Sequence, residues 1–330
     1  YKDLKVLILT SHINKRKSLN SMHVSIISTL YFSEEFIEEF CSRMQKSVES
    51  VTDSYEIILV DDGSPDKSYQ RAQIIHESNN KIKLIQLSRN YGHHRAMYAG
   101  IQHSKGELIF LIDSDLQEQP EAFPDFYNLL SQQKDLDAAI GVQENRQISL
   151  MDRISVLYYQ FFNKLSDAAY QEESQMTIRL MRRNLVNAFL EYKDKEIYFA
   201  PLFSLAGFNQ SFFPQKKLLK RKTTYTLAKR YNIFINAILS FSSKPLYFVF
   251  YSGILTTLAA SFFVSYIVLA KLFSHPVASG WSSLMASIWF LGGIIITFIG
   301  LVAIYINKIY IEIKDRPLYN IKKLEGFSEE

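Results

Sequence analysis

The chain has 330 residues, which is enough for one sizeable α/β domain and an appendage. Its net charge of +4 is modest and scattered, and the sequence has neither zinc-finger spacing nor a basic helix, which argues against a nucleic-acid-binding protein. The single cysteine, Cys41, excludes an intramolecular disulfide and a metal cluster made of cysteines alone, which fits a reducing compartment.

Residues 24–142 alternate short apolar runs with amphipathic segments, which predicts strands that alternate with helices. Ser33 is expected to cap the first helix, and the segment before Met22 is expected to be peripheral. Because this alternation implies right-handed crossovers, the pattern predicts an α/β fold with a mostly parallel sheet. The predicted strands are 24–29, 56–60, 82–87, 107–112 and 138–142.

Acidic loops follow two of the predicted strands, at the sheet edge where α/β proteins bind ligands. Asp113 and Asp115, separated by one residue, can converge on a hard cation such as Mg²⁺ or Mn²⁺, or on a cation and a ribose. Asp61 and Asp62 precede Gly63, so this loop is either a turn with a helix cap or a place where Asp62 accepts hydrogen bonds from a base or ribose.

Two long blocks near the C-terminus, Pro245–Ala270 and Leu272–Asn307, contain no Asp, Glu, Lys or Arg. Each supplies the roughly 20 apolar residues that a membrane-spanning helix needs, and the alternative is a pair of buried core helices. Basic residues flank the pair on both outer sides, so the positive-inside rule predicts a hairpin with both ends in the cytoplasm. The flanking residues are Lys229, Arg230, Lys244, Lys308, Lys314, Arg316, Lys322 and Lys323.

Three strings carry a family resemblance through their order and spacing: Ile58–Asp66, Leu87–His93 and Leu111–Gln117. They resemble family 2 glycosyltransferases of the GT-A fold. The hairpin, with Trp289–Gly293 and Ile309–Pro317, is similar to the polyprenyl-phosphate glycosyltransferases related to dolichyl-phosphate mannose synthase and GtrB-type bacterial enzymes. The resemblance covers residues 22–323, nearly the whole chain.

The resemblance implies a Rossmann-like GT-A domain with a mostly parallel sheet, followed by a two-helix transmembrane hairpin. It implies a multi-pass protein of the cytoplasmic (inner) membrane whose catalytic domain is cytoplasmic, and the membrane helices could also support a homo-oligomer. The predicted parts are an N-terminal extension (1–21), a catalytic domain (22–228), a juxtamembrane segment (229–244), the hairpin (245–307) and a cytoplasmic tail (308–330).

The resemblance also implies roles for individual residues. Asp113 and Asp115 should bind a divalent metal and the donor, Asp62 should contact the base, and Thr177 replaces an acid that relatives carry two residues before the residue matching Arg179. His93 and His94 are expected to be structural or close to a phosphate. The catalytic set implied is Asp113, Asp115, Gln117 and Arg179, and the donor-binding set is Tyr31, Glu34, Asp61, Asp62 and Arg89.

The function that follows is inverting transfer of a sugar from a nucleotide-sugar to polyprenyl (undecaprenyl-type) phosphate, for the synthesis or modification of a cell-surface glycan. The segment 150–165 is either an interfacial helix that supports this or a core helix. The basic run 216–222 either holds the acceptor phosphate, or only binds lipid headgroups or forms a solvated loop. One alternative is direct transfer to a surface polysaccharide or a lipid-linked oligosaccharide. Another is a non-catalytic membrane scaffold with a degenerate nucleotide-binding domain.

Overall fold

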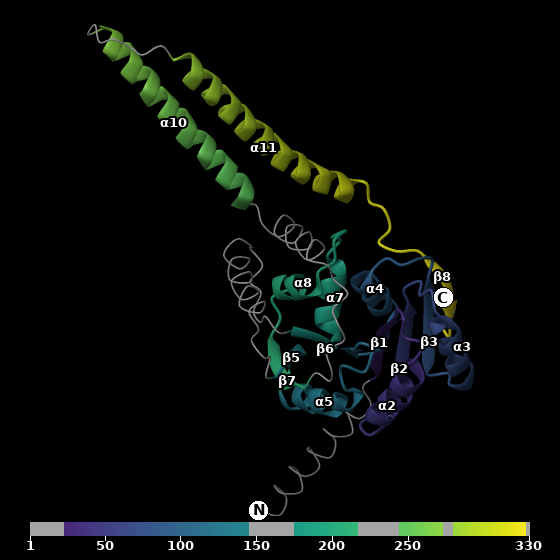
Figure 1. Cartoon of the computed structure of the whole chain (residues 1–330). Coiled ribbons are helices and arrows are strands. Elements are labelled where there is room, and N and C mark those ends of the chain that lie inside the picture. The colour runs from purple at the N-terminus through teal and green to yellow at the C-terminus, as the bar shows by residue number, and fades with distance from the viewer. Residues whose placement is uncertain (1–22, 145–174, 217–243, 273–279, 328–330) are drawn as a thin grey trace, which may run out of the picture. The chain divides into compact units, whose positions relative to one another are not determined.

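The computed structural model describes residues 23–144, 175–216, 244–272 and 280–327 (Figure 1). Its contacts divide the chain into two units. One is an α/β unit that includes the described residues up to 216 and the segment from Pro317 onward, and the other contains the two long helices near the C-terminus. The N-terminal extension, the segment 150–165 and the basic run after Lys216 lie outside the described residues.

The α/β unit is built on one sheet, whose described strands lie in the order β7-β5-β6-β4-β1-β2-β3-β8. Its centre is parallel, because β1 pairs in parallel with both β2 and β4, and β2 pairs in parallel with β3. Each of these strands begins and ends within a residue or so of its predicted range, and the predicted α/β architecture is confirmed. The bounds are β1 Val24–Leu30, β2 Tyr55–Asp61, β3 Ile82–Leu87 and β4 Leu108–Leu111.

Helices cover both faces of this sheet (Figure 1). The apolar side chains of α2, α3 and α5 join one buried cluster with alternate residues of the parallel strands, as expected for strands whose side chains alternate between faces. Phe110 of β4 lies at its centre, with its ring edge-on to Phe123 and Phe126. Helix α4 covers the opposite face. The bounds are α2 Ile37–Glu49, α3 Ser68–Ser78, α4 His93–His103 and α5 Phe123–Gln132, the last preceded by a 3₁₀ turn, Pro120–Ala122.

The prediction that the Ser33 side chain caps the first helix is wrong. Helix α2 begins at Ile37, and no side chain caps it. Ser33 is buried, and its hydroxyl lies 3.0 Å from that of Ser114, so the side chain is directed away from the helix amides. Ser33 instead links the loop after β1 to the acidic loop after β4.

The second half of the sheet is mixed. Strand β6 pairs antiparallel with both β4 and β5, and β7 pairs in parallel with β5. Helices α7 and α8 lie against each other, with the rings of Phe189 and Phe203 stacked at 4.5 Å. The bounds are β5 Ala138–Gln143, β6 Gln175–Arg182, α7 Arg183–Glu191, α8 Phe199–Leu205 and β7 Gln210–Gln215.

The last described strand, β8 (Ile321–Glu325), comes from the segment predicted as a C-terminal tail. It pairs antiparallel with β3 and forms the outer edge of the sheet. Residues beyond the second apolar helix therefore belong to the α/β unit.

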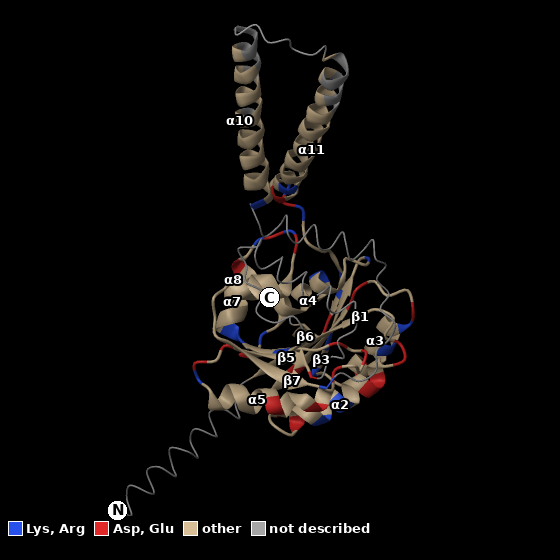
Figure 2. Cartoon of the chain, turned by 60° about the vertical axis from the view of Figure 1, so that its left-hand side comes forward, with Lys and Arg blue, Asp and Glu red and all other residues tan. Residues whose placement is uncertain are grey.

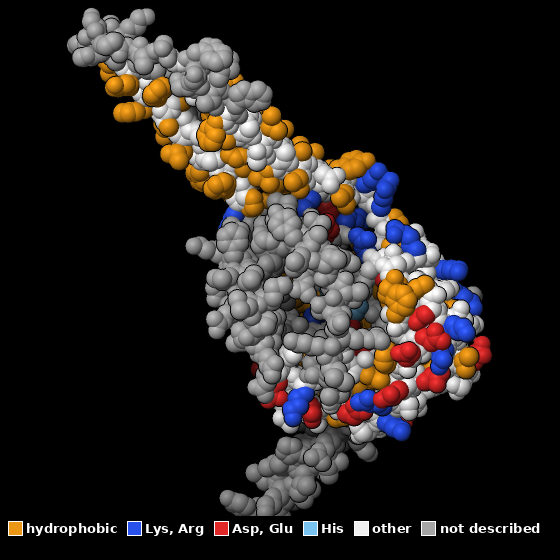
Figure 3. Space-filling model, viewed as in Figure 1, with side chains coloured by type: hydrophobic (Ala, Val, Ile, Leu, Met, Phe, Trp, Pro, Cys, Tyr) orange, Lys and Arg blue, Asp and Glu red, His pale blue; other side chains and the backbone are white. Residues whose placement is uncertain are grey.

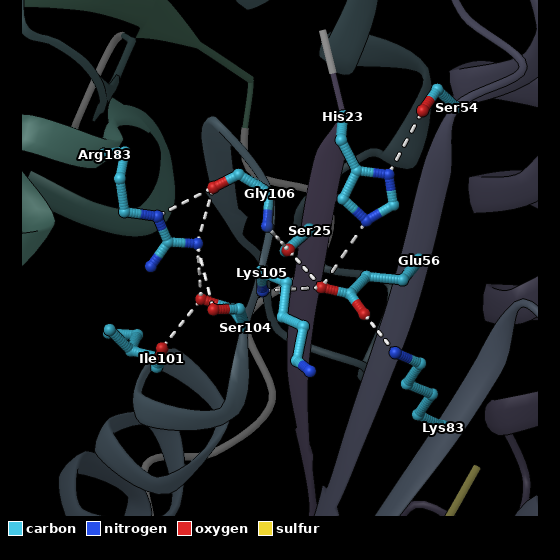
Figure 4. A network of polar contacts seen from close by, with 10 residues as sticks. All are labelled: His23, Ser25, Ser54, Glu56, Lys83, Ile101, Ser104, Lys105, Gly106 and Arg183. Carbon is cyan, nitrogen blue, oxygen red and sulfur yellow. Dashed lines mark hydrogen bonds and ion pairs between the residues drawn. The ribbon is translucent and has the colours of Figure 1, made fainter. Parts of the chain in front are cut away.

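A buried carboxylate, that of Glu56, holds together the amino ends of the parallel strands (Figure 4). Glu56 of β2 is 2% exposed, and it accepts hydrogen bonds from the Ser25 hydroxyl at 2.5 Å and the Lys83 ammonium at 2.6 Å. Ser25 also accepts the Gly106 amide, and Arg183 donates to the Gly106 carbonyl at 2.8 Å. Because the charge is paired and fully hydrogen-bonded, this network stabilises the sheet at the end remote from the acidic loops.

The other unit contains helices α10 (Lys244–Leu272) and α11 (Trp281–Ile313). Each is long and apolar enough to cross a membrane, over Lys244–Phe263 and Phe290–Ile313. Almost all of their length is free of charged side chains (Figure 2), and Figure 3 shows hydrophobic side chains along their surfaces. Among the residues of the two spans whose burial the structure describes, none is buried within the protein, unlike the core helices of a soluble domain.

Candidate active site

The loops after β1, β2 and β4 meet at the carboxyl edge of the parallel strands. Leu30 of β1 lies beside Asp61 of β2, and the Leu30 carbonyl accepts the amide of Asp62 at 3.1 Å. The Ser114 hydroxyl donates to the Thr29 carbonyl at 2.8 Å. Both acidic loops are therefore hydrogen-bonded to the end of the central strand.

Asp61 and Asp62 are both 2% exposed and both hold loop backbone. The Asp62 carboxylate accepts the amides of Tyr91 and Gly92 at 2.7 and 3.0 Å, which opposes the rise in its pKa that burial causes. Burial raises the pKa of Asp61 to about 6, although its carboxylate accepts the Ser64 amide at 3.1 Å. Asp61 thus shapes its own turn, while Asp62 ties the loop after β2 to the loop after β3.

Arg89 and Tyr31 are exposed at this edge. The Arg89 guanidinium lies over the Tyr91 ring, 4.2 Å from its centroid. This cation–π contact holds the guanidinium against the loop that carries both residues and that Asp62 fixes. Tyr31 is 47% exposed, and its ring meets that of Phe32 edge-on at 4.8 Å. An exposed aromatic surface and an exposed cation therefore lie on loops joined to Asp62.

Glu34 lies further from the acidic loops along the chain that follows β1. Its carboxylate accepts the amide of Lys67 at 3.2 Å and lies 3.5 Å from the Arg71 guanidinium. These partners belong to the beginning of α3, so the contacts of Glu34 support that helix.

Asp113, in the loop after β4, contacts residues of two other elements, β6 and α4. Its carboxylate accepts the Thr177 hydroxyl at 2.9 Å and lies 3.4 Å from Nε2 of His93. His93 Nδ1 in turn lies 2.9 Å from the Thr29 hydroxyl. The uncharged hydroxyl of Thr177 thus holds the Asp113 carboxylate by donating a hydrogen bond to it. The sequence does not predict this contact, which depends on the first residue of α4 lying beside the loop that follows β4.

Glu118 was missed by sequence analysis. It is 2% exposed, and its two oxygens accept the amides of Asp113 and Ile178, at 3.2 and 3.1 Å. A buried carboxylate thus joins the acidic loop to strand β6. In the same loop, the Asp115 carboxylate accepts the Gln117 amide at 3.1 Å, which closes a tight turn.

A cavity of about 340 Å³ lies between the acidic loop, the start of α4 and strand β6. It brings together Asp113 and Arg179, which are 66 positions apart (179 − 113) in the sequence. Arg179 is 6% exposed, and the carbonyls of Met176 and Thr177 accept hydrogen bonds from its guanidinium at 2.8 and 3.1 Å. The cavity lining also includes His93, His94, Gln175 and Phe199. Of the predicted residues, Asp113 and Arg179 line this cavity, whereas Tyr31, Glu34, Asp61, Asp62, Arg89, Asp115 and Gln117 do not.

The carboxylate oxygens of the loop after β4 are suitable ligands for a hard divalent cation. Among the described residues, no three His, Cys, Asp or Glu side chains gather in the way that a site made of protein ligands alone requires. Mg²⁺ characteristically binds through one or two carboxylates and completes its coordination with water and substrate phosphates. Asp113 and Asp115 can supply those carboxylates, so the residues present fit a cation that arrives with a phosphorylated substrate.

Comparison with known proteins identifies the fold and the family. A family model for glycosyl transferase family 2 matches residues 25–190. Among solved structures, glucosyl-3-phosphoglycerate synthase from Mycobacterium tuberculosis, in complex with Mn²⁺, UDP and phosphoglyceric acid, superposes with a TM-score of 0.51. It is 14% identical and covers 68% of this chain and 80% of its own, so the likeness concerns the GT-A fold alone.

Similar sequences extend over nearly the whole chain. A protein named "Putative glycosyltransferases" from Mycobacterium tuberculosis strain CDC 1551 is 37% identical over 92% of this chain and 89% of its own length. A prophage bactoprenol glucosyl transferase homolog from Escherichia coli strain K12 is 27% identical over 92% of this chain and 100% of its own. The predicted family is confirmed, and the match argues against a non-catalytic scaffold. The chain belongs to glycosyl transferase family 2 and is a glycosyltransferase.

Proposed function

We propose that this chain is a membrane-anchored, inverting glycosyltransferase that moves a sugar from a nucleotide-sugar to polyprenyl phosphate of the undecaprenyl type. The observation that carries the proposal is the combination, in one chain, of a family 2 catalytic unit with two long, exposed apolar helices. An acceptor with a polyprenyl tail stays in the bilayer, so its enzyme has to work at the membrane surface. The relatives named bactoprenol glucosyl transferase support this acceptor class, because bactoprenol is a polyprenol.

The donor would bind at the loops after β1, β2 and β3. Asp62 would accept a hydrogen bond from the base, since each carboxylate oxygen that takes one backbone amide retains a second lone pair. Tyr31 would stack on the base, Asp61 would hold the turn, and the exposed cation of Arg89 would face the diphosphate. Glu34 would act only indirectly, through the start of α3.

Transfer would take place beside the cavity of Asp113 and Arg179. An oxygen of the acceptor phosphate attacks the anomeric carbon from the face opposite the leaving group, the bond from that carbon to the diphosphate oxygen breaks, and the nucleoside diphosphate leaves with the electron pair. The acceptor is already an anion, so no general base has to remove a proton. Positioning and electrostatics then supply most of the rate enhancement.

The residues of this chain would hold and orient the two phosphorylated substrates. Arg179 places a buried guanidinium at the cavity, where charge-assisted hydrogen bonds to a phosphate are strong. Gln117 would lie near the reacting centre, on the turn that Asp115 closes. Asp113 and Asp115 would hold Mg²⁺ or Mn²⁺, which when bound would neutralise charge on the leaving diphosphate.

Helices α10 and α11 would form a hairpin in the cytoplasmic membrane, with the catalytic unit in the cytoplasm. The support is the distribution of basic residues, because Lys244 is the first residue of the first span and Lys314 and Arg316 follow the second. A cytoplasmic site is also where nucleotide-sugars and lipid phosphates meet. The glycan served would be one of the cell surface.

The proposal is tested by incubating the purified protein with undecaprenyl phosphate, MnCl₂ and each of a panel of radiolabelled nucleotide-sugars. We expect label to enter the lipid fraction from one donor. Asp113→Asn should lower the rate by about 100-fold or more, because the carboxylate charge at the reacting centre is lost. Asp125→Asn is the matched control, since Asp125 is an exposed acid in the first turn of α5, and it should leave the rate unchanged.

Two results would contradict the proposal. One is a wild-type protein that transfers sugar to an oligosaccharide or polysaccharide but not to undecaprenyl phosphate, which would favour the alternative acceptor class. The other is an Asp113→Asn variant as active as Asp125→Asn, which would remove Asp113 from the reacting centre.

A further inference from the structure

The C-terminal strand leads directly to the loop that follows β3. Strand β8 runs antiparallel to β3, and Ile321 of β8 lies beside Leu87, the last residue of β3. Since the loop 88–92 begins where β3 ends, the residues just before β8 lie next to that loop. This is the loop that carries Arg89 and that Asp62 holds from its other side.

Asn320, which precedes β8, makes two hydrogen bonds to this loop. Its backbone carbonyl accepts the Ser88 amide at 2.9 Å, and its side-chain amide donates to the Tyr91 hydroxyl at 3.1 Å. The Tyr91 hydroxyl also lies 2.9 Å from that of Ser88, which closes a small polar ring. The Arg89 guanidinium rests on the ring of the same Tyr91. Asn320 therefore fixes the aromatic ring that supports the exposed cation.

The C-terminal segment is itself held by contacts on both sides. The Tyr69 hydroxyl of α3 donates to Glu325 at 2.8 Å, and the Tyr319 hydroxyl donates to Gln102 of α4 at 2.6 Å. The ring of Phe327 packs edge-on against His103 at 5.8 Å. Because α3 and α4 cover opposite faces of the sheet, the segment is pinned across the sheet edge and can act as a fixed support.

The loop 88–92 thus lies between two supports that are far apart in the sequence. On one side the Asp62 carboxylate holds the amides of Tyr91 and Gly92, and on the other Asn320 holds the Ser88 amide and the Tyr91 side chain. These supports hold the loop against which the guanidinium of Arg89 rests, through the Tyr91 ring and the Asn90 carbonyl, which accepts its hydrogen bond at 3.3 Å. Without such a support an exposed arginine samples many rotamers.

We propose that Asn320 is a positioning residue for the donor site: it orients Tyr91 and, through Tyr91, the guanidinium of Arg89. The inference rests on the proposed function, in which Arg89 faces the diphosphate of the nucleotide-sugar. The donor site is then completed by residues that come after the second apolar helix in the sequence. Arg89 would bind the diphosphate in one defined geometry only when the C-terminal segment is in place.

The test compares Asn320→Ala, Tyr91→Phe, the double variant and the wild type. Asn320→Ala keeps the backbone carbonyl that pairs with Ser88, so β8 should still form, and Tyr91→Phe keeps the ring beneath Arg89. Loss of one exposed hydrogen bond should raise the KM for the nucleotide-sugar about two- to fivefold. The double variant should match Tyr91→Phe, because that variant already removes the contact to Asn320, together with the contact to Ser88. Lys322→Ala, an exposed position within β8, is the control and should change nothing.

A general loss of structure is separated from positioning by two further readouts. The KM for undecaprenyl phosphate should stay at the wild-type value in all variants. Hydrogen–deuterium exchange of the peptide 86–92 should accelerate in Asn320→Ala, while that of β1 and β2 should not change. This second measurement needs no substrate.

The outcomes are distinguishable. Wild-type donor KM and unchanged exchange of residues 86–92 in Asn320→Ala would overturn the inference and leave the proposed function intact. An equal rise in both KM values would also overturn it, as would effects of the two single variants that add in the double variant. If the wild type used no donor, the proposed function would fail, and the exchange experiment alone would decide whether Asn320 orders the loop.

Discussion

Gly63, in the loop after β2, lies against the backbone of the loop after β3. Its φ is +63°, in the left-handed region that favours glycine, and a Cβ at this position would lie 2.5 Å from the Arg89 carbonyl carbon and 2.7 Å from the Asn90 nitrogen. These are backbone atoms of the loop 88–92, so they cannot rotate away as a side chain would. Gly63→Ala should therefore displace that loop and weaken the hydrogen bonds that its amides donate to Asp62.

The magnitude follows from two separate costs. Left-handed backbone costs a non-glycine residue about 1–2 kcal/mol, and displacing the loop strains its hydrogen bonds, for a total of about 2–4 kcal/mol of stability. Gly207→Ala is the matched control, since Gly207 has a φ of +71° and its added Cβ would meet nothing closer than the Leu205 carbonyl oxygen at 3.9 Å. That variant should lose only about 1–2 kcal/mol.

The assay is thermal unfolding of each purified variant, followed by circular dichroism. Both tryptophans, Trp281 and Trp289, lie in α11, so tryptophan fluorescence would not report on the α/β unit. Gly63→Ala should lower Tm more than Gly207→Ala does, and it alone should raise the KM for the nucleotide-sugar. Equal changes in both variants would refute the reasoning, because the close approach to Arg89 would then have no consequence.

Further predictions concern charge and topology. Asp115→Ala should abolish transfer and leave membrane insertion unchanged; near-normal turnover of the purified variant at saturating Mn²⁺ would argue against a metal role. Burial raises the pKa of Asp61 to about 6 in the folded protein. The stabilisation that comes from protonated Asp61 is therefore fully present below about pH 4 and is lost as the pH rises through 6. The free energy of unfolding of Asp61→Asn should exceed that of the wild type by about 1–2 kcal/mol at pH 7.5 and differ little from it at pH 4. A gain that is independent of pH would contradict this. A cysteine introduced at Ser279 should react with an impermeant thiol reagent added outside the cell and one at Ser328 should not, and buried Cys41, whose pKa burial raises to about 12, should give no background. The reverse labelling pattern would overturn the hairpin orientation.

The parallel half of the sheet could be predicted because its strands are continuous apolar runs between polar loops. Val24–Leu30 and Tyr55–Asp61 are buried on both faces, so composition alone marks them. Strand β8 could not be predicted in the same way. Its Lys322 and Lys323 resemble a solvated tail, and it becomes a strand only because β3 offers a free edge.

Much of the candidate site was predictable from the position of acids at strand ends, which bring Asp62 and Asp113 to one edge of the sheet. The contacts that hold them were not. Glu118 and Asn320 act through backbone amides and a phenol that lie next to them only in the fold. Ser33 was expected to cap a helix because local sequence cannot show that the Ser114 hydroxyl competes for it.

The central claim is that the sugar is transferred to a lipid monophosphate. It is tested most directly by mass spectrometry of the product that the purified wild-type protein makes from undecaprenyl phosphate and its active nucleotide-sugar. The account predicts a lipid with a single phosphate and one added sugar. A lipid fraction without such a product, while labelled sugar accumulates on an oligosaccharide or polysaccharide, would contradict it.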